Sequence, residues 1–323
     1  MKFLSIPENG SSWVESLIYE MDMESSTPQD LTVEIVNSVT HQSLGICRLY
    51  GVQKARVDIA PYVRAACVNS LENNTISSLV ISKAACKLFV VANGNISDER
   101  LYFRAKLDSS RAQLLSTMPE RQSIVLGDVV RFTAFALSKV EVKLVVKTAL
   151  TNKQTTLSCQ TLGMPVEAII PTATLPAHSS RITIHIYCDG ELINSLVCDV
   201  ARRDSTARTL VWINGLGGVE YYTFPHSKRT SYEAKVESIS YGQQSDAGVL
   251  RATIYRSLLS GAELSEEMER IAALLFSPKI YECRGGELIE AELPTRVLKF
   301  DKHNRLPQIV VDIAERWQGG ELC

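Results

Sequence analysis

The chain has 323 residues, of which 45% are hydrophobic and 22% are charged, a balance typical of globular proteins. It carries 34 basic and 36 acidic residues, so its net charge of −2 excludes strong electrostatic attraction to nucleic acid or to an anionic membrane surface. We therefore expect two or three domains with cores large enough to need no disulfides, and no nucleic-acid partner.

The amino terminus lacks the pattern of a secretory signal peptide. Met1–Leu4 begins like one, but Ser5 and Pro7 interrupt the apolar run at once. The sequence also has no run of about 20 apolar residues that would predict a membrane span. We therefore expect synthesis in the cytoplasm, with no signal peptide and no membrane span.

The eight cysteines are expected to be buried free thiols, because the cytoplasm is reducing and disfavours disulfides. No two of them have C-x-x-C spacing, so no structural zinc site is predicted. Cys188 and Cys198 flank a tight turn, and the alternative is that they face each other across a hairpin.

Residues 1–122 are predicted to form an N-terminal β-rich domain. Leu31–Ile35 alternates between apolar and polar residues, and this period of two buries one face of a strand. Pro61 suits the first position of a helical turn that continues through Arg64. Arg111–Met118 is predicted as a further short helix.

Residues 123–205 are predicted to form a β-sandwich of the immunoglobulin type, because strand patterns such as Val140–Leu144 alternate with turns at short intervals. Two apolar-rich runs between Arg181 and Val200 flank Asp189-Gly190. Both central residues of a type I′ turn need positive φ, which Asp-Gly adopts at low cost. The pattern therefore predicts a β-hairpin with its turn at Asp189-Gly190.

Residues 206–323 are predicted to form a C-terminal β-rich domain that follows a polar linker at Arg202–Arg208. A second hairpin is expected to turn at Gly217-Gly218. Its strands are expected at Leu210–Ile213 and Tyr221–Phe224, which are rich in apolar and aromatic residues.

One amphipathic helix is predicted near residues 265–276, where Ser265 can cap the N-terminus. Four apolar residues follow with the spacing of one helix face: Met268, Ile271, Ala272 and Leu275. Strands are expected again near residues 296–300 and 308–313. The predicted fold class is mainly β, with tandem immunoglobulin-like β-sandwich domains and a C-terminal α+β region that contains this helix.

The sequence offers no constellation of catalytic, cofactor-binding or metal-ligating residues. The five histidines have no metal-ligand spacing to another His, Cys or acidic residue, and the nucleophile-elbow and phosphate-loop motifs are missing. Asn214–Gly218 is glycine-rich, but the strand pattern Val219–Phe224 follows it where a dinucleotide site needs a helix. We therefore predict no cofactor and no enzymatic activity.

Four aromatic residues, Trp212, Tyr221, Tyr222 and Phe224, gather in one predicted hairpin. One interpretation is an ordinary core with cross-strand aromatic pairs. The other is a patch that binds a partner protein, because aromatic residues are enriched at interfaces. These four residues are the candidate interface.

Three segments occur in the order Val57–Arg64, Leu210–Phe224 and Leu274–Tyr281, and strand patterns follow up to Trp317. In this order they resemble uncharacterised structural proteins encoded in phage and prophage regions of Bacteroidetes-type bacteria, which look like tail or baseplate components. The resemblance implies a virion protein with other virion proteins as partners, in a homo-oligomer. It implies no catalytic residue.

The predicted function is therefore that of a non-enzymatic structural protein that acts by protein–protein packing. The alternative is a β-sandwich binding module for carbohydrate binding or adhesion, although no motif supports a glycan ligand. An enzyme would show a polar cleft with convergent titratable residues.

Overall fold

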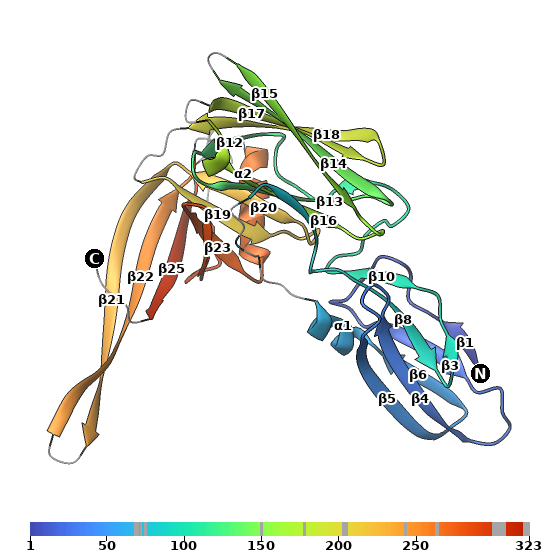
Figure 1. The fold of residues 1–323 in the computed structure, drawn as a ribbon. Helices are drawn as coiled ribbons and strands as arrows, with labels where there is room; N and C mark the ends of the chain where they lie inside the picture. The colour runs from blue at the N-terminus through green and yellow to red at the C-terminus, as the bar shows by residue number, and fades with distance from the viewer. Residues whose placement is uncertain are drawn as a thin grey trace.

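In this computed structural model, the structure describes residues 1–67, 71, 73, 76–148, 151–176, 179–201, 206–241, 244–261, 265–298 and 308–318. The described chain is mainly β, as predicted, with two short α-helices, α1 (Ala60–Ala66) and α2 (Ser265–Ala272). Figure 1 shows an N-terminal sandwich, a central stack of sheets, and a C-terminal sheet whose long hairpin extends away from the other strands.

The N-terminal sandwich encloses one apolar core between two sheets. The first sheet contains, in spatial order, β1 (Lys2–Ser5), β3 (Ile18–Asp22) and β6 (Lys54–Asp58). The second contains β2 (Ser11–Ser12), β10 (Arg100–Phe103), β8 (Cys86–Ala92), β4 (Gln29–Asn37) and β5 (Ser43–Val52), with β9 (Asn95–Ile96) on β8. The predicted strand at Leu31–Ile35 is confirmed, because β4 buries every second residue of this segment. Helix α1 confirms the helical turn predicted at Pro61.

The strand β7 (Ser78–Ile81) crosses from this sandwich into the central stack. It pairs antiparallel with β16 (Val166–Pro171), although β6 before it and β8 after it both belong to the N-terminal sandwich. The short strand β11 (Gln113–Leu114) likewise pairs with β13 (Val129–Phe135). The predicted boundary at residue 122 therefore does not coincide with a break between sheets.

The helix predicted at Arg111–Met118 is wrong. Gln113 and Leu114 form a strand opposite Phe135 and Ala134, and the Leu115 N–H donates to the Thr133 carbonyl. Pairing with a neighbouring strand satisfies these backbone groups, and so it overrides the weak local preference for a helix.

The central stack contains a second sandwich with a continuous apolar core. One of its sheets has the order β11–β13–β16–β7. The other contains β12 (Arg121–Val125), β18 (Glu191–Ala201), β17 (Ser179–Cys188), β14 (Lys139–Thr148) and β15 (Asn152–Gln160). The strand predicted at Val140–Leu144 is confirmed, since β14 buries alternate residues along its length.

The hairpin of β17 and β18 is confirmed with its turn at Asp189 and Gly190, whose φ angles are 53° and 92°. Positive φ at both positions is what a type I′ turn requires. Cys188 and Cys198 do not face each other, because their cross-strand partners are Glu191 and Ile182. All the cysteines that the structure describes are free thiols, and five of these seven are buried.

The next sheet covers the central sandwich and contains β20 (Val219–Phe224), β19 (Arg208–Ile213), β23 (Ile280–Arg284) and β24 (Glu287–Ala291). The hairpin predicted around Gly217-Gly218 is confirmed by the pairing of β19 with β20. One face of this sheet joins the central core, and the other packs against α2 and the last sheet. The predicted C-terminal domain therefore shares a core with the central sandwich.

The last sheet contains β21 (His226–Tyr241), β22 (Gln244–Leu259) and β25 (Val310–Gln318). Helix α2 and the 3₁₀ turn Ala273–Phe276 confirm the helix predicted near residues 265–276, and β25 confirms a strand near residues 308–313. Residues 296–298 are not in a strand, and residues 299–300 lie outside the described part. Of the predicted linker, residues 202–205 also lie outside it, and Arg208 already begins β19.

Asp189 holds a second turn in place beside its own hairpin. Its carboxylate accepts hydrogen bonds from the Leu137, Ser138 and Lys139 N–H groups at 2.8–2.9 Å. Partial burial raises the pKa of Asp189, but hydrogen bonds from the Ser138 hydroxyl and from these N–H groups outweigh it and lower the pKa to about 2.

We expect Asp189→Asn to lower the melting temperature by a few degrees at pH 7 and to have a smaller effect in acid. A carboxylate with a lowered folded-state pKa stabilises the fold above its unfolded value of 3.8, and this contribution disappears as the pH falls toward 2. Melting temperatures of both proteins from pH 7 to pH 3 measure the difference. A deficit that does not change with pH would contradict this account.

Candidate functional site

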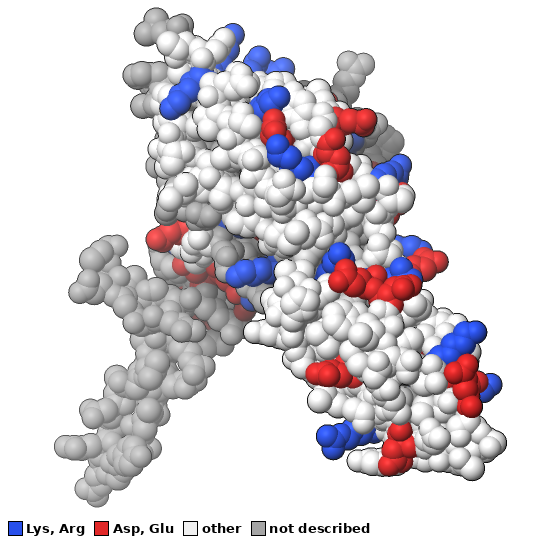
Figure 2. Space-filling view, turned by 45° about the vertical axis from the view of Figure 1, so that its right-hand side comes forward, with Lys and Arg blue, Asp and Glu red and all other residues white. Residues whose placement is uncertain are grey.

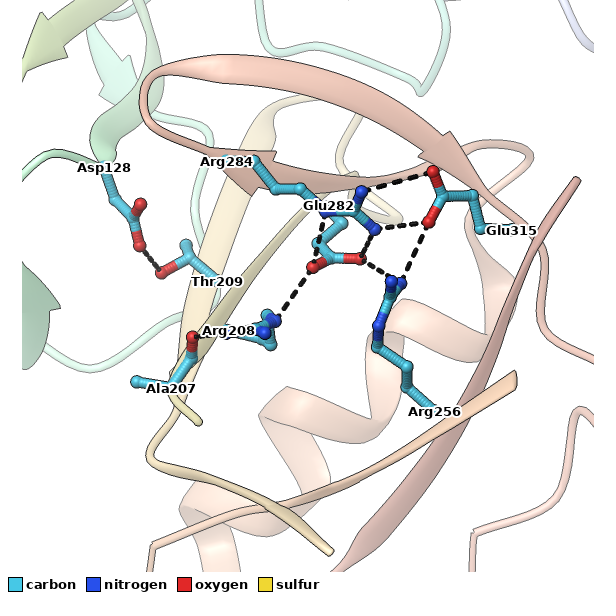
Figure 3. A network of polar contacts seen from close by, with 8 residues as sticks. All are labelled: Asp128, Ala207, Arg208, Thr209, Arg256, Glu282, Arg284 and Glu315. Carbon is cyan, nitrogen blue, oxygen red and sulfur yellow. Dashed lines mark hydrogen bonds and ion pairs between the residues drawn. The ribbon is translucent and has the colours of Figure 1, made fainter. Parts of the chain in front are cut away.

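A buried carboxylate, Glu282, lies at the point where the last sheet joins the rest of the chain (Figure 3). Glu282 is on β23, and it is 1% exposed. Its Oε1 accepts hydrogen bonds or ion pairs from the Nε atoms of Arg284 at 3.0 Å and Arg208 at 3.2 Å. Its Oε2 accepts from the guanidinium groups of Arg284 at 2.8 Å and Arg256 at 3.1 Å.

A second carboxylate, Glu315 on β25, completes this cluster. It accepts from an Arg256 guanidinium nitrogen at 3.0 Å and from an Arg284 nitrogen at 3.2 Å, and it makes a further short contact with Arg284. The cluster of Arg208, Arg256, Glu282, Arg284 and Glu315 therefore joins β19 and β23 of one sheet to β22 and β25 of the next. We refer to it as the arginine–glutamate cluster.

Within this cluster, Arg284 and Glu315 stabilise each other's ionised forms. Burial raises the pKa of Glu315, but hydrogen bonds and attraction from Arg284 and Arg256 lower it by more, so the net shift is downward. The hydrogen bond to Glu282 is the largest cause that raises the pKa of Arg284. A carboxylate held ionised in this way is a poor proton donor at neutral pH, so the arrangement suits structural anchoring better than acid–base chemistry.

Two further buried polar contacts anchor the sheet of β19 and β20 to the central sandwich. The Thr209 hydroxyl on β19 donates to the Asp128 carboxylate, and it also hydrogen-bonds the Thr223 hydroxyl at 2.9 Å. Glu220 on β20 is 1% exposed and accepts from the Thr117 hydroxyl at 2.9 Å and the Asn214 amide at 2.8 Å. Buried polar groups with partners of this kind fix one arrangement of the layers.

The candidate interface of four aromatic residues does not form an outer patch. Trp212 and Phe224 are 0% exposed and pack toward α2, whereas Tyr221 is 2% exposed and belongs to the central core. Tyr222 is half-buried; its hydroxyl accepts from the Gly261 N–H at 3.1 Å and its ring meets Phe224 edge to face. These aromatic residues hold layers of the same chain together, as the core interpretation proposed.

The sequence prediction missed the arginine–glutamate cluster. The available signal was local: Glu282 and Arg284 alternate with Tyr281 and Cys283 in a short strand. Charged residues on a strand with both faces covered need partners. The partners Arg256 and Glu315 come from distant strands, so only the fold reveals them.

In the part of the chain that the structure describes, no three His, Cys, Asp or Glu side chains are grouped so that they could hold a metal ion. No helix within that part has the length and apolar character that a membrane span requires. His185 lies on β17, and its Nδ1 atom hydrogen-bonds the Ser195 hydroxyl at 2.8 Å.

Comparison with known proteins adds nothing to the fold that the structure itself shows. No family model matches the chain, and no curated protein matches it. Among solved structures, CBD12 from CALX1.2 is similar at 6% identity and a TM-score of 0.19, covering 58% of this chain and 93% of that chain. Dpr2 Ig1-Ig2, from its complex with DIP-Theta Ig1-Ig3, is similar at 10% identity and a TM-score of 0.19, covering 62% and 99%. Similarity at this level carries no statement about function.

We expect Glu282→Gln to destabilise the chain by about 3–5 kcal/mol, because it removes the charge that three buried or half-buried guanidinium groups share. Glu290→Gln is the matched control. Glu290 is 56% exposed on the neighbouring strand and pairs with Lys279 at 3.1 Å, so its loss should cost roughly 0–1 kcal/mol. Urea denaturation of both variants measures the two free energies of unfolding. Equal effects would show that the arginine–glutamate cluster does not anchor the last sheet.

Proposed function

We propose that this chain is a non-enzymatic structural protein of a phage or phage-derived particle, of the tail, tail tip or baseplate, and that it acts by packing against other proteins. The observation that carries the proposal is the long hairpin of β21 and β22, which we call the arm. Figure 1 shows the arm extending away from the body of the chain.

Among the residues that the structure describes, the distal part of the arm has two strands, β21 and β22. The described part of β25 pairs with β22 from Leu259 to Arg251, whereas β21 and β22 continue to pair up to Tyr241 and Gln244. At about 3.3 Å per residue, the two-stranded part is roughly 20 Å long. A two-stranded hairpin is marginally stable in water by itself, so contact with another protein would stabilise it.

The anchoring of the arm supports a mechanical role. Arg256 lies on β22 and Glu315 lies on β25, so the arginine–glutamate cluster attaches the base of the arm to the body. A projecting element with a rigid base can hold a neighbouring subunit at a defined angle.

The balanced charge supports packing among many copies, and Figure 2 shows acidic and basic side chains interspersed on one face with wide uncharged areas between them.

A β-sandwich binding module is the second candidate, and one observation favours it. The outer face of the N-terminal sandwich exposes Ile46, Tyr50 and Ile96 at 51%, 72% and 66%. Ile46 and Ile96 lie in one cross-strand row with Glu34 and Val91 between them. A glycan array separates the two candidates, since the structural-protein proposal expects no glycan binding.

We expect the purified chain to form a ring or another oligomer of more than two chains, and we expect loss of the arm to leave nothing larger than a pair of chains. In the truncated variant, Asn-Gly replaces residues 237–249 and closes the hairpin between Val236 and Leu250, which are already paired. The arginine–glutamate cluster and β25 remain, so the melting temperature should stay close to that of the full chain. Light scattering and negative-stain microscopy of both proteins measure assembly.

A full chain that is monomeric at every concentration and missing from purified particles would contradict the proposed function. An oligomer that survives truncation unchanged would contradict the role of the arm, but not the class of protein.

A further inference from the structure

Within the described ranges of the chain, the outer edge of β15 has no strand paired to it. β15 is the last strand of its sheet, and it pairs with β14 over nine consecutive residues. The Thr148 N–H donates to the Thr151 carbonyl, and the Thr161 N–H donates to the Ser138 carbonyl. These two hydrogen bonds fix which residues of β15 bond to β14. By the alternation of an antiparallel ladder, the backbone groups of five residues point outward: Asn152, Gln154, Thr156, Ser158 and Gln160.

This edge lacks the features that prevent strands from pairing with other molecules. Its sequence, Asn-Lys-Gln-Thr-Thr-Leu-Ser-Cys-Gln, contains one charge, Lys153, and no proline. Its register with β14 has no bulge. All of its residues except Leu157 and Cys159 are exposed. Natural proteins protect an edge strand with charges, prolines, bulges or covering elements, because an unprotected edge recruits another strand.

Other edges of the same chain are protected. The register of β5 with β4 is interrupted at both ends, and the Tyr62 ring of α1 lies against Gly45 of β5. The outer strand of the arm, β21, has two register shifts and carries Lys228, Arg229 and Glu233. The β15 edge therefore differs from the edges of β5 and β21.

We infer that β15 pairs antiparallel with β15 of a second copy, about a two-fold axis at Thr156. In this register Thr156 faces its own counterpart, Gln154 faces Ser158, and Asn152 faces Gln160. The five residues with outward backbone groups thus pair only with one another, which is the condition for a regular hydrogen-bonded ladder. The two five-stranded sheets become one continuous sheet of ten strands.

The side chains of β15 also suit pairing with a second copy. The one charged residue, Lys153, faces Cys159 of the partner strand, so no like charges lie directly opposite each other. Thr156 facing Thr156 and Gln154 facing Ser158 are neutral pairs that can hydrogen-bond. A single strand pair buries little surface, so the association is weak and its extent rises with concentration. This pairing goes beyond the proposed function, because two copies can pair in this way whether or not they join a particle.

Thr156→Pro tests the pairing in the full-length chain. The Thr156 N–H points away from β14, so proline removes a hydrogen bond from the ladder with the second copy and leaves the fold intact. Sedimentation equilibrium should show the pairing of two chains to be at least ten-fold weaker than in the unchanged chain, at an unchanged melting temperature. A folded variant that associates as strongly as the unchanged chain would overturn the inference.

Cross-linking gives a second readout that does not depend on the proline variant folding. Thr156→Cys, in a Cys159→Ser background, places two thiols opposite each other at the two-fold axis, within the Cα separation that a disulfide allows. Thr155→Cys in the same background is the matched control, because Thr155 faces Leu157 of the partner strand. Mild oxidation should give a covalent pair with the first variant and little with the second. No covalent pair, or equal yields, would overturn the inference, and either result would leave the arm-truncation test unaffected.

Discussion

The placement of the last sheet depends on the burial of one carboxylate. Glu282 lies on a strand whose two faces are both covered, so its charge cannot reach water. The charge is tolerated because Arg208, Arg256 and Arg284 converge on it. Two of these arginines also hold Glu315, which lies on the strand that flanks the arm. This requirement for paired charges admits one relative position of the two sheets, because any shift would leave a buried charge alone.

Shared apolar cores and a shared strand connect the sheet that carries Glu282 to the rest of the chain. The sheet that carries Glu282 shares an apolar core with the central sandwich through Tyr221 and Cys283. The central sandwich in turn takes β7 from the N-terminal segment, so the N-terminal sandwich is attached at both ends of that strand. The sheets are therefore connected layers, and Figure 1 shows the arm and β15 on different parts of them.

Sequence patterns predicted what depends on neighbouring residues. The Asp189-Gly190 turn, the alternation along β14 and the amphipathic α2 are determined within a few positions of the chain, and the structure has all three. The pairing of β7 with β16 and the convergence on Glu282 join residues far apart in sequence, so no local period records them. The aromatic hairpin shows the same limit, since its pattern favours a core only slightly over an outer patch.

Hydrogen–deuterium exchange along the arm tests the central claim most directly. We propose that the body anchors the base of the arm and that another protein surface completes its two-stranded tip. Amides of residues 236–241 and 244–250 should therefore exchange rapidly in the isolated chain and become protected in the assembly, while those of β23 stay protected in both. Protection of the tip in the isolated chain, or unchanged rapid exchange in the assembly, would contradict the account.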